Sequence, residues 1–201
     1  MDLKGFDHPG ELSAGGTRSV KVMIAGGFGT GKTTMVRSVS DIKPLTTEET
    51  LTQASADVDH LIGVADKTET TVSLDFGKIS INDSLMLYLF GTPGQERFWF
   101  LWNGLFKGAL GAVVLVDTRR LASSFRAIEE MERQDVPFVI ALNVFPDSKD
   151  HPIEEIRDAL DISPQTPIVV CDARDRASSR DVLITLMRHL MERSAAALEP
   201  R

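Results

Sequence analysis

Short apolar runs alternate with amphipathic segments along this chain, a pattern typical of a sheet that carries helices on both faces. Three of the runs, residues 111–116, 137–142 and 167–171, are almost wholly apolar. Parallel strands that are covered on both faces have this composition. Three earlier strands are predicted, and a short polar turn of the kind that closes a hairpin separates the last two. These strands cover residues 20–25, 71–81 and 85–90.

Apolar residues at helical spacing fill the intervals between the strands. The first such helix begins at Lys32 and carries Met35, Val36 and Val39. Residues 45–66 are rich in Thr, Asp, Glu and Ala, and predict a long surface connection. We therefore predict an α/β fold: a mostly parallel six-stranded sheet with one antiparallel edge hairpin and helices on both faces. Later helices are expected at residues 121–133, 153–160 and 181–192.

We interpret the chain as a single domain with short tails, since 201 residues suffice for one core. Residues 1–18 are rich in Gly, Ser and charge, and predict a flexible N-terminal leader. Residues 19–194 hold the expected domain, and residues 195–201 the C-terminal tail.

Charge and cysteine content exclude several classes of function. Against 29 Asp and Glu there are 22 Lys and Arg, a net charge of -7, which argues against nucleic-acid binding. The single cysteine, Cys171, excludes an intramolecular disulfide and favours the cytoplasm. No apolar run of about 18 residues could span a bilayer. Asp2 stands where myristoylation needs glycine, and the last residues offer no cysteine for prenylation, so we expect no direct membrane anchor.

A glycine-rich loop follows the first predicted strand and opens the first predicted helix. It reads Gly26-Gly27-Phe28-Gly29-Thr30-Gly31-Lys32-Thr33 and matches the phosphate-binding pattern G-x-x-x-x-G-K-[ST]. In such a loop the backbone N–H groups bind phosphate oxygens, Lys32 reaches the terminal phosphates, and the Thr33 hydroxyl is a ligand for Mg²⁺. We predict that this loop, with Thr34 after it, binds a nucleotide.

A second motif, Gly91-Thr92-Pro93-Gly94-Gln95-Glu96-Arg97-Phe98, follows the third predicted strand. With it the chain resembles the Ras-like small GTPases, over most of residues 19–194. The resemblance implies a P-loop NTPase fold, GTP and GDP as ligands, Mg²⁺ as cofactor and GTP hydrolysis. It implies that Gly94 donates its N–H to the γ-phosphate and that Gln95 orients the attacking water. The hydroxyl of Thr71 would complete the Mg²⁺ shell, as in Rab-type members, with Thr70 as the alternative.

The resemblance is looser where the family reads the base with N-K-x-D. This chain has Asn143-Val144-Phe145-Pro146-Asp147, so the aspartate falls one residue late and reaches guanine only if the loop bulges. The later Asp172 and Ala173 resemble the family's S-A-K loop, whose alanine N–H reads the guanine oxygen. GTP is favoured, and ATP or relaxed selectivity is the alternative.

Two departures from the family pattern bear on the mechanism. Gly91 replaces an aspartate that helps to hold Mg²⁺, so we expect weaker metal dependence of nucleotide binding. Phe28 stands where Ras has a small glycine beside the γ-phosphate, and its ring would obstruct an arginine supplied by another protein. We expect slow intrinsic hydrolysis that an activator raises by repositioning the chain's own groups, Arg97 being one candidate. The alternative is a nucleotide-binding scaffold with little or no hydrolysis.

Gly91-Thr92-Pro93-Gly94-Gln95 resembles the gliding-motility branch, which also lacks the aspartate and carries the proline. The sequence is more closely similar to small GTPases encoded in actinobacterial conservons, and residues 25–29, 43–48 and 89–100 carry this resemblance. That resemblance implies a signalling switch with a roadblock-type regulator as partner, and contact with a membrane sensor-kinase-like protein through a complex. Aromatic residues crowd the segment after the second motif and predict either a partner surface or core packing. They are Phe98, Trp99, Phe100, Trp102 and Phe106.

Overall fold

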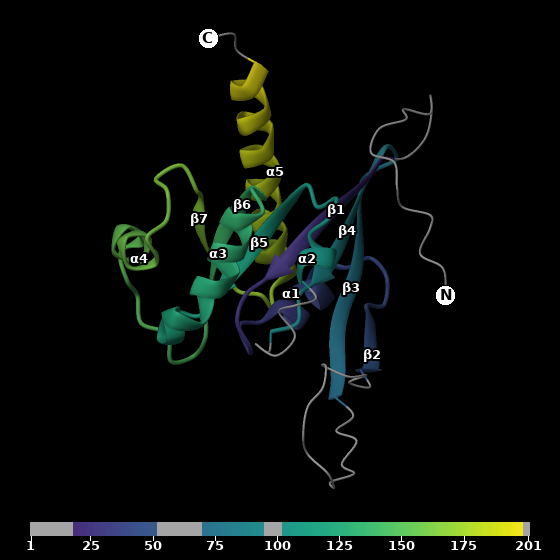
Figure 1. Ribbon diagram of the computed structural model, residues 1–201, viewed down its shortest axis with the longest axis horizontal. Coiled ribbons are helices and arrows are strands. Elements are labelled where there is room, and N and C mark those ends of the chain that lie inside the picture. Colours follow the sequence, from purple (N-terminus) through teal and green to yellow (C-terminus); the bar gives the residue numbers. More distant parts are fainter. Residues whose placement is uncertain (1–17, 52–69, 95–101, 199–201) are drawn as a thin grey trace, which may run out of the picture.

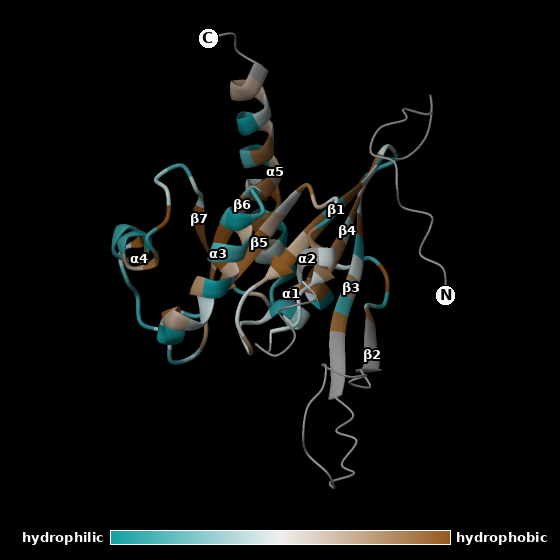
Figure 2. Ribbon diagram, viewed as in Figure 1, coloured by the Kyte–Doolittle hydropathy of each residue, from teal (hydrophilic) through white to brown (hydrophobic). Residues whose placement is uncertain are grey.

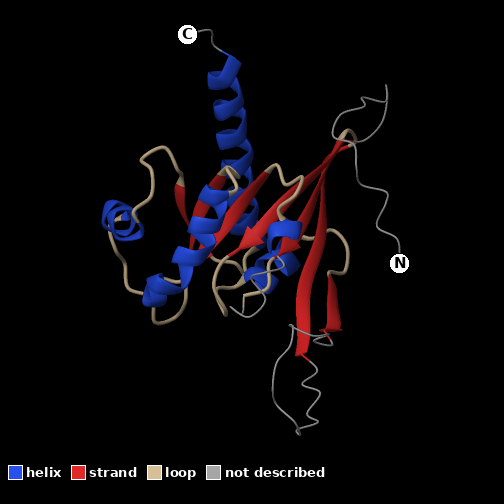
Figure 3. Ribbon diagram, in the orientation of Figure 1, coloured by secondary structure: helices blue, strands red, loops and turns tan. Residues whose placement is uncertain are grey.

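The computed structural model describes residues 18–51, 70–94 and 102–198, which form one sheet flanked by helices (Figure 1). Strands and helices alternate along most of the chain (Figure 3). The strands are β1 Arg18–Ala25, β2 Leu45–Leu51, β3 Thr70–Asn82, β4 Leu85–Gly91, β5 Gly111–Val116, β6 Phe138–Asn143 and β7 Ile168–Cys171. The helices are α1 Lys32–Val39, α2 Trp102–Leu105, the 3-10 segment η2 Thr118–Ser124, α3 Phe125–Arg133, α4 Ile153–Leu160 and α5 Arg176–Leu198.

The strands lie in the order β2-β3-β4-β1-β5-β6-β7. From β4 to β7 all neighbours are parallel, whereas β3 runs antiparallel to both β2 and β4. The predicted α/β class and the hairpin of β3 and β4 are therefore confirmed. Because β1 lies in the middle of the sheet, the loop that follows it opens at the carboxyl ends of the central strands, where α/β proteins bind ligands.

The sheet has seven strands, so the prediction of six is wrong by one. Leu45–Leu51, expected to belong to a surface connection, forms β2 and pairs with β3 in the register Leu45 with Phe76 and Thr50 with Thr71. The hairpin of β3 and β4 consequently does not form the edge of the sheet. Threonine favours extended backbone, and an edge strand needs little apolar burial, so its composition resembled that of a loop.

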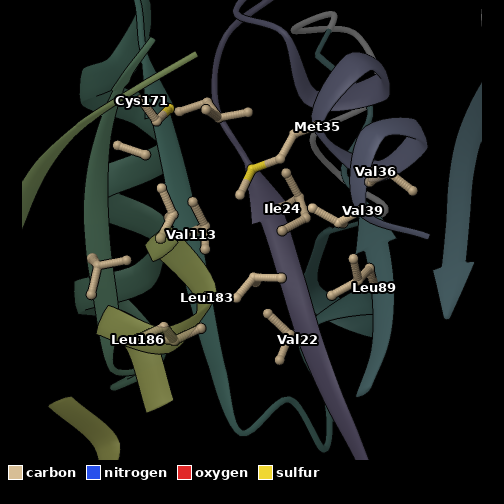
Figure 4. Packing of buried hydrophobic residues seen from close by; sticks show 14 of the residues in the cluster. Val22, Ile24, Met35, Val36, Val39, Leu89, Val113, Cys171, Leu183 and Leu186 are labelled. Atoms are coloured by element: carbon tan, nitrogen blue, oxygen red, sulfur yellow. The ribbon is translucent and has the colours of Figure 1, made fainter. Parts of the chain in front are cut away.

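Two apolar clusters cover the two faces of the sheet. Alternate residues of β1 enter different clusters, with Val22 and Ile24 on one face and Met23 and Ala25 on the other. α1 and α5 pack on the first face, shown in Figure 4, and α2, α3 and α4 on the second. Apolar residues accordingly concentrate in the central strands (Figure 2). β5 and β6 are buried throughout, as their composition predicts, whereas β7 lies at the edge and is only partly buried.

Two helices differ in extent from the sequence-based expectation. Residues 121–133 divide into the end of η2 and α3, and the side chain of Asp117 caps the start of η2 by accepting from the Arg119 N–H. α5 spans residues 176–198, and its last turns extend past the sheet (Figure 1). In the described part of the chain, no helix is both long enough and apolar enough to cross a membrane.

Candidate functional site

The glycine-rich loop joins β1 to α1 and adopts a backbone that glycine alone adopts readily. Gly26, Gly29 and Gly31 have φ values of 137°, 76° and 104°, in the region that disfavours side chains. A Cβ at position 26 would also lie 2.4 Å from the Leu115 carbonyl oxygen. The loop therefore turns tightly against β5, and Gly31 directs it into the N-terminus of α1. This is the geometry in which backbone N–H groups and the helix dipole favour a phosphate.

Lys32 folds back into this loop. Its Nζ donates to the carbonyl oxygens of Gly26 at 2.9 Å and Gly27 at 2.6 Å, and the residue is only 8% exposed. Burial lowers the pKa of Lys32 to about 8, against an opposing effect of the Asp75 carboxylate. The loop thus holds a buried cation.

The loop threonines have different environments. Thr30 is buried and its hydroxyl donates to the Gly27 carbonyl at 3.0 Å, so it stabilises the loop from inside. Thr33, in the first turn of α1, donates to a carboxylate oxygen of Asp75, a buried residue of β3. Thr34 is exposed on the same turn.

The start of the second motif lies directly against the loop. A Cβ at Gly94 would be 2.7 Å from Lys32 Nζ and 3.0 Å from Phe28 Cα, so position 94 has no room for a side chain. The indole of Trp102 in α2 donates to the Pro93 carbonyl at 3.2 Å and holds this segment in place. The structure thus brings together Gly94 and Lys32, the two residues expected to contact the terminal phosphates. Gln95 and Arg97 lie outside the described residues.

Two of the five crowded aromatic residues belong to the core. Trp102 and Phe106 are buried and contact each other edge to face, with ring centroids 5.7 Å apart. For these two the packing alternative is confirmed. Phe98, Trp99 and Phe100 lie outside the described residues, so a partner surface there remains a prediction.

Asn143 joins the loop to the predicted base site. It ends β6 and is buried; its Nδ2 donates to the Thr30 carbonyl at 3.0 Å, and its Oδ1 accepts from the Ala173 N–H at 2.9 Å. A Cβ at Gly31 would be 2.5 Å from Asn143 Nδ2, so the asparagine packs closely on the loop. The structure thus brings together Asn143 and Ala173, which the resemblance assigns to the base site.

The two carboxylates of the predicted base site are both close to arginines. The side chain of Asp147 is 87% exposed and lies 4.0 Å from Arg119 Nη1. Asp172 accepts from Arg174 at 2.7 Å and 2.9 Å, and this hydrogen bonding lowers the pKa of Asp172 to about 2. Asp172 therefore stays ionised at neutral pH, and its carboxylate could accept a hydrogen bond from a ligand.

The arginines that follow β5 were not predicted as part of the site. Fully buried Asp117 accepts from Arg119 at 2.9 Å and from Arg120 at 3.2 Å, and hydrogen bonding from Arg119 lowers the pKa of Asp117. Arg120 Nη2 also lies 3.4 Å from the Phe28 carbonyl oxygen. The available signal was an arginine pair directly after the carboxyl end of a central strand, where ligands bind in such sheets.

Asp75 was also missed. Its signal was a carboxylate on the side of β3 that alternation assigns to the interior, with Gly77 and Ile79. Thr71 belongs to β3 and pairs with Thr50 of β2, and its side chain lies outside the described residues, as does that of Thr70.

Cys171 has no catalytic feature. It is buried at the end of β7, and burial, with a contribution from Asp172, raises the pKa of its thiol to about 12. The thiol is therefore protonated at neutral pH and behaves as a small core residue.

Residues that could hold a divalent cation are present next to the loop. Among the described residues no group of three or more His, Cys, Asp or Glu side chains could hold a metal ion. Thr33 and Asp75 nevertheless offer hard oxygen ligands beside Lys32. Mg²⁺ is commonly bound by one or two protein oxygens together with phosphate oxygens and water, so these residues fit it.

Comparisons with known proteins agree with this geometry. Residues 24–193 match the family described as "Conserved hypothetical ATP binding protein". The uncharacterized protein MJ1339 of Methanocaldococcus jannaschii is 28% identical over 62% of this chain and 69% of its own length. Ras-related protein Rab-11C of Dictyostelium discoideum is 30% identical over 39% of each chain.

Two solved structures share the fold. The G domain of the T. maritima FeoB iron transporter has a TM-score of 0.56 and 18% identity, over 87% of this chain and 98% of that one. The FeoB G domain from Methanococcus jannaschii has a TM-score of 0.59 and 13% identity, over 87% and 99%. The fold is therefore that of a G domain.

Proposed function

Because the chain belongs to the family of conserved hypothetical ATP-binding proteins, we propose that it binds a nucleoside triphosphate at the loop of residues 26–33, and that this ligand is GTP. The observation that supports binding most directly is the buried ammonium of Lys32 inside a glycine loop at a helix N-terminus. Mg²⁺ would be held by Thr33 and Asp75, and when bound it would neutralise charge on the phosphates.

The choice of GTP is supported by the base site. The family's description names ATP, whereas one relative is a Rab protein and the solved neighbours are G domains. In this chain Asn143 ties the phosphate loop to the loop of Ala173, so two residues assigned to the guanine site by resemblance lie together. The alternative, relaxed ATP and GTP selectivity, is favoured by the exposed Asp147, which contacts Arg119.

Nucleotide released from the purified protein tests this proposal. We expect denaturation to release GDP or GTP in near-stoichiometric amounts, identified by chromatography, and the emptied protein to prefer fluorescent GDP to fluorescent ADP. Adenine nucleotide in the released fraction, or equal affinity for both analogues, would support relaxed selectivity. No bound nucleotide and no affinity for either analogue would contradict the proposed function itself.

The hydrolytic step is proposed to use groups of the chain itself. Gln95 would orient the attacking water, as in the family that the second motif resembles. Arg120, held by buried Asp117 and lying 3.4 Å from the Phe28 carbonyl, is a candidate for the cation beside the phosphates. A cation fixed there would stabilise charge that develops in the transition state.

Arg120→Ala is expected to slow single-turnover GTP hydrolysis at least about tenfold while changing GTP affinity little. Gln95→Leu should slow hydrolysis as well.

The fold should survive Arg120→Ala because Arg119 still pairs with Asp117. Arg126→Ala is the matched control, since Arg126 is exposed on α3 and pairs with Glu129. If Arg120→Ala and Arg126→Ala hydrolyse GTP at the wild-type rate, Arg120 has no part in the reaction. A wild-type rate near zero would instead favour the scaffold alternative.

The protein is further proposed to act as a slow GTPase switch with a roadblock-type regulator. This part is supported by the resemblance of its second motif to bacterial switch GTPases. The regulator would bind one nucleotide state in preference to the other. Equal retention of a roadblock-type partner by GDP-loaded and GTP-analogue-loaded protein would contradict the switch.

A further inference from the structure

We propose that Asp75 supplies, from β3, the carboxylate that the second motif lacks at Gly91 in β4, and that it positions Thr33 toward Mg²⁺. The inference rests on the proposed nucleotide and Mg²⁺ binding at the glycine-rich loop. No comparison and no sequence motif gives Asp75 a role in metal binding.

The register of β3 and β4 places the two positions side by side. Asp75 pairs directly with Gly91 across the antiparallel ladder. A Cβ built on Gly91 would lie 3.0 Å from Asp75 Cβ and 3.3 Å from its Oδ2. The Asp75 side chain therefore fills the space that a side chain at position 91 would take. The aspartate at position 75 therefore favours glycine at position 91, because a larger residue there would contact the Asp75 side chain too closely.

The contacts of Asp75 point toward the phosphate loop. Asp75 is 7% exposed, and its Oδ2 accepts the hydroxyl hydrogen of Thr33, the residue that the loop motif assigns to Mg²⁺. The ammonium of Lys32 is close enough to interact with the same carboxylate. Burying a carboxylate is costly unless its environment offers hydrogen bonds or opposite charge. This one lies beside a threonine hydroxyl and near a cation, where metal and phosphates would bind.

Two consequences follow for metal dependence. First, the chain keeps a carboxylate beside Thr33, so nucleotide retention should depend on Mg²⁺ despite Gly91, contrary to the expectation from the motif alone. Second, carboxylates at 75 and 91 together should clash and repel, whereas moving the carboxylate from 75 to 91 should preserve both volume and charge.

The release rate of fluorescent GDP from the full chain, in Mg²⁺ and after chelation by EDTA, tests the inference. In the wild type, chelation should speed release at least about tenfold. Asp75→Asn keeps volume and a hydrogen-bond acceptor, and should reduce the effect of chelation to within about twofold. The exchanged variant Asp75→Gly/Gly91→Asp should restore it. Asp41→Asn is the matched control and should behave as wild type. Its carboxylate also contacts β3, where it accepts from the Ser80 N–H.

The outcomes separate the inference from the proposed function. A wild-type chain that retains no nucleotide contradicts the proposed function. A wild type with Mg²⁺-sensitive release, together with Asp75→Asn of equal sensitivity, overturns the role of Asp75 alone. Should Asp75→Asn fail to fold, the exchanged variant decides: Mg²⁺-sensitive release supports the inference, and its loss overturns it.

Discussion

Replacing Lys32 with Met is expected to lower the affinity for GDP and GTP at least about 100-fold, which corresponds to about 2.7 kcal/mol. The ammonium lies inside the phosphate loop, and hydrogen bonds from a cation to phosphate are among the strongest in proteins. Methionine fills a similar volume but offers no donor. Titration of the nucleotide-free protein with fluorescent GDP and GTP analogues measures the loss.

The same substitution should change the free energy of unfolding of the nucleotide-free chain by less than about 1 kcal/mol. Two hydrogen bonds to the carbonyls of Gly26 and Gly27 are lost, but the cost of keeping a cation buried is also relieved. That cost is what lowers the pKa of Lys32 to about 8. Urea unfolding without nucleotide measures this second quantity.

Lys21→Met is the matched control, because Lys21 lies on β1, where it donates to the Lys107 carbonyl and stacks on Phe90. It should leave nucleotide affinity unchanged. If Lys32→Met binds nucleotide as tightly as Lys21→Met, the glycine-rich loop does not hold the phosphates. If Lys32→Met loses both nucleotide affinity and free energy of unfolding, the lysine supports binding by stabilising the folded chain and not by contacting the phosphates.

The parts of this molecule that could be predicted from its sequence are those encoded by contiguous residues. The loop of residues 26–33 carries its own conformational requirement, since glycines at positive φ and the following helix are all local features. The central strands β5 and β6 carry uninterrupted apolar runs because both of their faces are covered. Asn143 and Ala173 were found through the resemblance to the family's N-K-x-D and S-A-K motifs, which are also short contiguous patterns.

What could not be predicted depends on pairing between distant segments. Leu45–Leu51 has the composition of a loop, and only its ladder with β3 makes it a strand. Gly91 was interpreted as a missing carboxylate, because its partner Asp75 lies on the other strand of the hairpin and outside the second motif. Arg120 was missed for the same reason, since its contact with Phe28 joins two loops that are far apart in sequence. Strand register and contacts between loops depend on the tertiary structure, so short sequence motifs do not indicate them.

Replacing Asn143 with Ala is expected to lower the free energy of unfolding by about 2–4 kcal/mol even without nucleotide. The change leaves the Thr30 carbonyl and the Ala173 N–H without their side-chain partner, and an unsatisfied buried polar group costs about 1–3 kcal/mol. Because these two bonds join the phosphate loop to the loop after β7, nucleotide affinity should fall as well. Urea unfolding of the nucleotide-free protein isolates the structural effect from any contact with the base.

Two further variants test the Asn143 bridge, that is, its hydrogen bonds to Thr30 and Ala173. They show whether the loss of stability comes from these bonds or from the loss of any asparagine. Asn143→Asp keeps an acceptor for the Ala173 N–H but loses the donor to Thr30, so its loss of stability should include repulsion between a carboxylate and a carbonyl. Asn82→Ala removes hydrogen bonds to Ser84 in an exposed turn and should cost less than about 1 kcal/mol, since water replaces them. If Asn143→Ala costs no more than Asn82→Ala, the bridge does not hold the two loops together. In that case nucleotide selectivity would depend on residues other than this pair of contacts.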